Sequence, residues 1–119
     1  MATRAYFGIE NKDGTIDYVY NHWDGYPEGL GRDLCALSRR LARSLVNEGD
    51  RSTFETSYAS MRGQVCPFQT CVSRSGFLDK LQASSCEYAY LLTRHGAWLF
   101  ASYNDRRFHS LKRKLKYND

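Results

Sequence analysis

The sequence predicts an α+β fold in which an antiparallel sheet packs against one long helix and two short helices. Two dipeptides predict the strands: Asp13-Gly14 and His95-Gly96 each separate two runs of alternating apolar residues, which is typical of β-hairpins. A leucine at every third or fourth position between residues 30 and 45 predicts the long helix. With 119 residues, 42% of them apolar, the chain is expected to form one domain over residues 1–119.

The N-terminal hairpin is expected to join strands over residues 5–10 and 15–22. A two-residue turn centred on Asp13-Gly14 would pair Ile9 with Tyr18, because both central positions of such a turn favour positive φ. This register predicts a core face made of Phe7, Ile9, Tyr18 and Tyr20.

The C-terminal hairpin is expected to join strands over residues 87–93 and 97–103. A two-residue turn at His95-Gly96 would pair Leu92 with Leu99. Both faces of this hairpin are apolar, which predicts a position near the centre of the sheet.

The long helix is expected over residues 27–46. Pro27 suits its first position, where a missing N–H costs nothing, and Gly49 follows its end. Arg32, Arg39 and Arg43 lie opposite the leucines, as either a solvated surface or a partner-binding surface. The leucines that form the predicted core stripe are Leu30, Leu34, Leu37, Leu41 and Leu45.

Two short helices are expected at one edge of the sheet. Ser52 and Glu55 have the spacing of a capping box, which predicts a helix over residues 54–62. A second helix is expected over residues 77–83. The segment between them, residues 64–75, shows no periodicity and is expected to be a long loop.

The net charge of +4 is concentrated in the C-terminal segment, residues 106–119. Such a segment is either a solvated tail or a site for a polyanion or an acidic protein surface. The positive charge excludes a nucleic-acid mimic, and no apolar run is long enough to cross a membrane. The candidate binding residues of this segment are Arg106, Arg107, Lys112, Arg113 and Lys114.

The four cysteines are expected to be reduced thiols, because the N-terminus has no signal-peptide pattern and a cytoplasmic location is therefore expected. Cys66 and Cys71 are four residues apart, but no histidine lies at a spacing that would complete a zinc site. Cys35 and Cys86 are expected to be buried. The sequence therefore predicts no metal and no cofactor.

The densest motif, residues 21–31, lies between the second strand and the long helix. Such a corner directs unpaired N–H groups toward one point, so Asp24 is expected to accept hydrogen bonds from them. Trp23 and Tyr26 could stack on a base or ring, with Arg32 one turn away. His22 and Asp24 could also act as a general base and its orienting carboxylate, but no nucleophile stands at a recognisable spacing.

The opening of the chain resembles small proteins of tailed phages and prophages. The resemblance covers residues 3–31 and is strongest in His22-Trp23-Asp24-Gly25-Tyr26-Pro27-Glu28-Gly29. It implies a phage or mobile-element protein, without implying a reaction.

Three functions follow from these observations. The first is a non-enzymatic accessory protein, anti-CRISPR-like or related, that inhibits a bacterial defence system by binding a host protein or nucleoprotein complex. The second is a nucleotide or single-stranded nucleic-acid binder, and the third is a small phosphoesterase that uses His22 and Asp24. No membrane partner is expected, and pairing with a second copy of the chain is left open.

Overall fold

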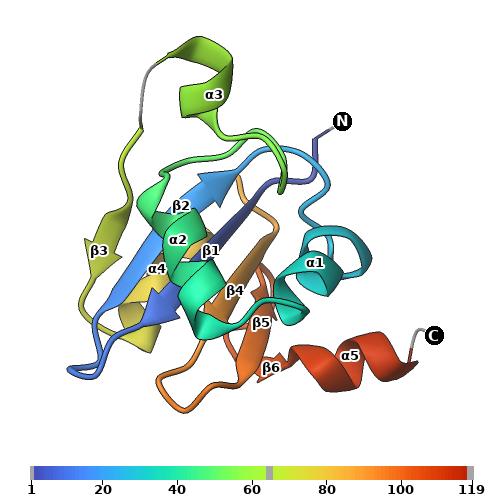
Figure 1. Ribbon diagram of the computed structural model, residues 1–119. Helices are drawn as coiled ribbons and strands as arrows, with labels where there is room; N and C mark the ends of the chain where they lie inside the picture. The colour runs from blue at the N-terminus through green and yellow to red at the C-terminus, as the bar shows by residue number, and fades with distance from the viewer. Residues whose placement is uncertain (1, 64–65, 118–119) are drawn as a thin grey trace.

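The α+β class is confirmed: six strands form one sheet, and helices cover both of its faces (Figure 1). The structure, a computed structural model, describes residues 2–63 and 66–117. The strand order is β3-β2-β1-β4-β5-β6. The strands are β1 (Ala5–Glu10), β2 (Ile16–Asn21), β3 (Gln69–Cys71), β4 (Tyr88–Leu92), β5 (Trp98–Ser102) and β6 (His109–Ser110).

The sheet is mixed, so the prediction of a purely antiparallel sheet is wrong. Both expected hairpins form, but they meet through their first strands, β1 and β4, which run parallel. Hairpin signals determine the pairing within each hairpin and carry no information about how two hairpins meet. The apolar residues on both faces of β1 and β4 are buried, because these two strands lie in the centre of the sheet and a cluster of buried side chains covers each face.

Both hairpins have three-residue turns instead of the predicted two-residue turns. In the first, Asn11 N donates to Thr15 O at 2.8 Å, and Gly14 has a φ of +91°. In the second, Thr93 N donates to Ala97 O at 2.8 Å, and Gly96 has a φ of +92°. One residue in the left-handed region closes such a loop, and glycine adopts it readily.

The longer turns shift both predicted registers by one residue. Ile9 lies opposite Asp17 instead of Tyr18, and Leu92 lies opposite Trp98 instead of Leu99. A one-residue shift moves each affected side chain to the other face of the sheet. Tyr18 and Tyr20 therefore lie on the face opposite Phe7 and Ile9, which corrects the predicted core face.

The predicted helix over 27–46 is interrupted, because the Ser38 side chain accepts from Leu41 N at 3.3 Å and starts a second helix there. The leucine stripe is broken at the same point: Leu30 and Leu34 are buried, whereas Leu41 is 55% exposed. Three elements replace the single helix: a π-helical turn η1 (Pro27–Gly31), α1 (Arg32–Cys35) and α2 (Arg39–Asn47).

The other helices are α3 (Tyr58–Arg62), α4 (Arg74–Ala83) and α5 (Leu111–Tyr117). The first starts four residues later than predicted, because Ser57 rather than Ser52 caps it. The predicted helix over 77–83 is confirmed as part of α4, but it covers a face of the sheet rather than an edge. The predicted loop over 64–75, of which 64 and 65 lie outside the described residues, contains β3, which pairs with β2, and the first two residues of α4.

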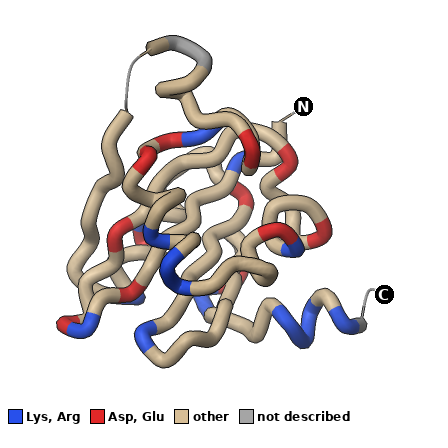
Figure 2. Tube along the Cα trace, viewed as in Figure 1, with Lys and Arg blue, Asp and Glu red and all other residues tan. Residues whose placement is uncertain are grey.

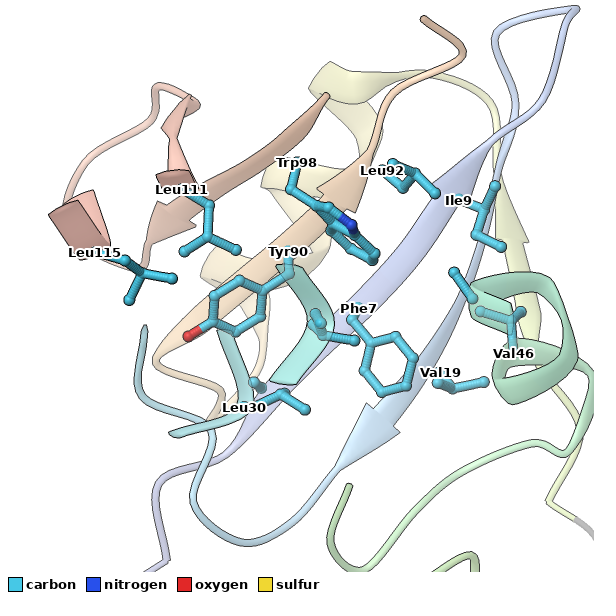
Figure 3. Close-up of a cluster of buried hydrophobic side chains, with 13 residues drawn as sticks. Phe7, Ile9, Val19, Leu30, Val46, Tyr90, Leu92, Trp98, Leu111 and Leu115 are labelled. Atoms are coloured by element: carbon cyan, nitrogen blue, oxygen red, sulfur yellow. The ribbon is translucent and has the colours of Figure 1, made fainter. Parts of the chain in front are cut away.

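Two clusters of buried side chains lie on the two faces of the sheet. The larger cluster lies between the sheet and η1, α1, α2 and α5, and Figure 3 shows Phe7, Tyr90 and Leu111 within it. The smaller cluster lies under α4 and contains Phe77 and Leu81. No helix among residues 2–63 and 66–117 combines the length and the apolar character needed to span a bilayer.

Candidate functional site

The corner between β2 and η1 has a main chain that is fixed by the segment after α2. His22 N donates to Arg51 O at 3.1 Å, and Trp23 N donates to Ser52 O at 2.8 Å. The buried Asn21 side chain adds a hydrogen bond from Nδ2 to Trp23 O at 2.7 Å. The position of Trp23 therefore depends on the distant segment at Arg51 and Ser52 and on the neighbouring Asn21 side chain.

Asp24 and Gly25 form the turn of this corner. Asp24 has a φ of +58°, and its main-chain oxygen accepts from Leu30 N at 2.9 Å. The expectation that the Asp24 side chain caps the helix is wrong, because no side-chain hydrogen bond caps η1. A Cβ atom on Gly25 would lie 2.6 Å from Thr3 O, so only glycine fits this close approach.

Two aromatic side chains project from this corner. Trp23 is 45% exposed and Tyr26 is 41% exposed, and they border an open hollow of about 320 Å³. The opposite wall of the hollow comes from the loop before α3, with Phe54 half-buried. Aromatic side chains beside a hollow are typical of the centre of a protein interface. The hollow is lined by Trp23, Asp24, Tyr26, Gly29, Leu30, Asp33, Thr53, Phe54 and Glu55.

The charged groups of this hollow are acidic. Burial raises the pKa of the Asp33 carboxyl above its usual value, and the negative charge of Glu55 raises it further. Asp24 also lines the hollow. Three carboxylates disfavour a phosphate group at this position, so the corner suits a neutral or cationic partner surface better than a nucleotide.

His22 and Asp24 do not form the predicted base and orienting pair. The His22 ring lies with Nδ1 2.6 Å from the Tyr20 hydroxyl, and burial raises the pKa of that phenol to about 12. Within the described residues, no hydrogen bond joins His22 to Asp24. The geometry therefore gives the phosphoesterase hypothesis no support.

The arginines of α2 bind other parts of the same chain. Arg39 donates to Thr93 O at 3.0 Å and to Glu10 O, and Arg43 forms an ion pair with Asp17 at 3.0 Å. These contacts hold α2 against the turn ends of both hairpins. Of the predicted arginine surface, Arg39 and Arg43 therefore bind groups of the same chain, and Arg32 lies at the start of α1.

The basic C-terminal segment is divided between internal pairs and an exposed surface. Arg106 pairs with Asp79 at 2.5 Å, and Arg107 lies 3.5 Å from Asp105. Leu111 and Leu115 of α5 are buried in the core, so this helix is docked rather than a free tail. Figure 2 shows the cations along α5, where Lys112, Arg113 and Lys114 are exposed.

The cysteines occupy different environments. Cys86 is buried, and burial raises the pKa of its thiol to about 11, whereas Cys35 is only half-buried and Cys66 is exposed. Cys71 is half-buried, and burial raises the pKa of its thiol as well. In the part of the chain that the structure describes, no group of three or more metal-ligating side chains comes together.

Asp33, Phe54 and Glu55 line the hollow although nothing in the sequence motif marks them as parts of the corner. The capping-box pattern drew attention to Glu55 but pointed to a helix start instead of a wall of the hollow. Long-range main-chain hydrogen bonds, from His22 N to Arg51 O and from Trp23 N to Ser52 O, bring the two segments together. Comparison of the chain with protein-family models, with curated proteins and with solved structures finds no match in any of the three.

Proposed function

We propose that this chain is a non-enzymatic accessory protein of a phage or mobile element that inhibits a bacterial defence system by binding a host protein or nucleoprotein complex. The binding surface is the corner around Trp23 and Tyr26. One observation carries the proposal: two large aromatic side chains stand 45% and 41% exposed beside a hollow, on a main chain that is fixed by other segments. Aromatic residues in such positions often dominate binding energy.

Two further observations support this direction. The resemblance of residues 3–31 to small proteins of tailed phages and prophages favours a role against a bacterial host. The His22 ring has the Tyr20 hydroxyl as its partner and, among the described residues, no hydrogen bond to Asp24, which favours a binding role over catalysis. The carboxylates of the hollow favour a partner that presents a basic or neutral side chain to the corner.

The test uses a panel of bacterial strains, each of which carries one defined defence system. The chain is expressed in each strain, and the efficiency of phage plaquing is measured. We expect recovery of plaquing in at least one strain and copurification of a component of that defence system. The proposal fails if no strain of the panel recovers plaquing.

A pair of matched variants then tests the corner itself. Trp23→Ala combined with Tyr26→Ala removes both aromatic side chains, and we expect binding to weaken by about thirtyfold or more. Val72→Ala combined with Tyr103→Ala is the control, because these side chains are 81% and 56% exposed elsewhere on the molecule. Equal binding by the two double variants, at matched melting temperatures, would place the interface outside the corner.

A further inference from the structure

A second surface, distinct from the corner, lies where α5 crosses the edge of the sheet. It is an open hollow of about 410 Å³. Its floor comes from β5 and β6, and its wall comes from the outward side of α5. The lining residues are Phe100, Ser102, Asp105, His109, Ser110, Arg113 and Lys114.

Cations dominate the rim of this hollow. Arg113 and Lys114 line it and Lys112 precedes them on α5, and within residues 2–63 and 66–117 none of the three has an ion pair. The one acid in the lining, Asp105, lies 2.8 Å from His109 Nε2 and 3.5 Å from Arg107 Nε. The net positive charge therefore faces solvent, where it attracts phosphate groups.

An aromatic platform lies beside these cations. Phe100 and His109 are opposite each other in the β5–β6 register, with ring centroids 5.8 Å apart and ring planes inclined at 45°. Phe100 is half-buried and His109 is exposed, so part of each ring is available to a stacked partner. Ser102 and Ser110 place hydroxyl groups at the same hollow.

We infer that this surface binds single-stranded nucleic acid, with an unpaired base over Phe100 and His109 and the adjoining phosphates at Arg113 and Lys114. A positively charged groove with an aromatic platform is the usual arrangement for single strands, whose bases are free to stack. A duplex presents only its phosphates to such a surface. A lipid bilayer is a poorer match, because the apolar residues Leu111 and Leu115 are already buried in the core.

The inference goes beyond the proposed function, because it concerns another surface and another class of partner. The corner is acidic, and the α5 surface is basic, so one partner chemistry does not fit both. Loss of one activity would leave the other in place.

Fluorescence anisotropy of a labelled 12-nucleotide single strand tests this inference with the full chain at 50 mM salt. We expect binding to the single strand at least fivefold tighter than to a duplex of the same sequence. Phe100→Leu keeps an apolar side chain but removes the ring, and we expect affinity for the single strand to fall about tenfold. Arg113→Ala combined with Lys114→Ala should reduce the magnitude of the log–log salt slope by about 1.4, at about 0.7 per contact.

The matched control is Lys12→Ala combined with Arg40→Ala, which removes two exposed cations at other positions. We expect this control to weaken binding less than twofold. Equal losses of affinity in the two double variants would show that the single strand is attracted to positive charge in general, and this result would contradict the proposed site. Absence of binding to the single strand, or equal affinity for the duplex with no effect of Phe100→Leu, would also overturn it.

Discussion

Two helices of this molecule carry cations on one side, and they use them in opposite ways. In α2, Arg39 and Arg43 point back to the sheet, where they bind two carbonyl oxygens and the Asp17 carboxylate. In α5, two buried leucines hold the helix in place, while its cations face solvent. Clustered cations in a sequence therefore either bind groups of the same chain or face solvent. Only the position of the partner groups in the structure distinguishes the two cases.

The difference has a physical origin in the sheet below each helix. The turn ends of the two hairpins leave carbonyl oxygens and a carboxylate beneath α2, and buried acceptors of this kind require donors. The sheet below α5 presents the apolar surface of Tyr90, and Leu111 packs close to it across Gly31. The first helix adds hydrogen bonds and an ion pair to the burial of Ala42 and Val46, whereas the second is held by the burial of Leu111 and Leu115.

The largest expected effect tests the apolar attachment of α5. Leu111→Ala removes a fully buried side chain, and we expect the free energy of unfolding to fall by about 3 kcal/mol, within the usual range for such truncations. Urea denaturation measures it, with Lys114→Ala as the control on the same helix. A loss below 1 kcal/mol would mean that α5 is held by something other than its leucines.

The second-largest expected effect tests how strongly the buried Glu10 carboxylate holds the turn ends of the two hairpins together. Glu10 is buried, and its carboxylate accepts from Arg74 Nε at 2.7 Å and from Arg94 N at 3.0 Å. The hydrogen bond from Arg74 holds the pKa of Glu10 at about 2, below the ordinary value of 4.5. The folded state therefore binds this proton less readily than the unfolded state, and the stabilisation is present above pH 4.5 and lost toward pH 2.

The expected contribution of Glu10 is on the order of 2–3 kcal/mol, reduced by solvent screening around the half-exposed Arg74 side chain. The measurement is the free energy of unfolding from pH 5 to pH 2 in the natural chain and in Glu10→Gln. The variant should show a shallower fall, because other carboxylates such as Asp17 keep their own contributions. Parallel curves would show that Glu10 contributes nothing to the acid sensitivity.

The third effect compares two neighbouring arginines of α2. Arg39→Ala breaks the hydrogen bonds to Thr93 O and Glu10 O, a loss of about 2 kcal/mol. A few tenths of a kcal/mol of stability are regained, because the substitution removes a positive charge from the first turn of the helix, where the helix dipole disfavours it. We therefore expect a net destabilisation of about 1.5 kcal/mol by urea denaturation, and almost none for Arg40→Ala, whose side chain has no hydrogen bond or ion pair within residues 2–63 and 66–117. Similar losses in both variants would mean that the hydrogen bonds of Arg39 do not set it apart from Arg40.

The sequence predicted the elements that depend on local chemistry. Asp13-Gly14 and His95-Gly96 marked both turns correctly, and Leu30 and Leu34 were correctly assigned to the core. The loop length was missed, because the same dipeptides fit turns of two and three residues. The parallel contact of β1 with β4 was missed, because it joins residues about eighty positions apart without a local signal.

The residues of the candidate site also fall into two groups, those that the sequence motif indicates and those that only long-range contacts bring to the hollow. Trp23 and Tyr26 could be selected from the motif, and the structure leaves both exposed. Phe54 and Glu55 could not be selected, because they reach the hollow only through contacts between the corner and Arg51 and Ser52. For the same reason, the sequence could not separate Arg43, which pairs with Asp17, from the exposed cations of α5.

The smallest expected effect completes the comparison of the two helices. Replacing Lys112, Arg113 and Lys114 together with alanine removes three exposed cations, and surface changes of this kind rarely exceed about 0.5 kcal/mol. We expect any change at low salt to be stabilising, because Lys112 and Lys116 repel each other one turn apart. Alanine also favours the helix. Urea denaturation at 20 and 200 mM salt measures the change and its screening. A loss above 1 kcal/mol at both salt concentrations would mean that α5 uses its cations as α2 does, and the two helices would no longer differ.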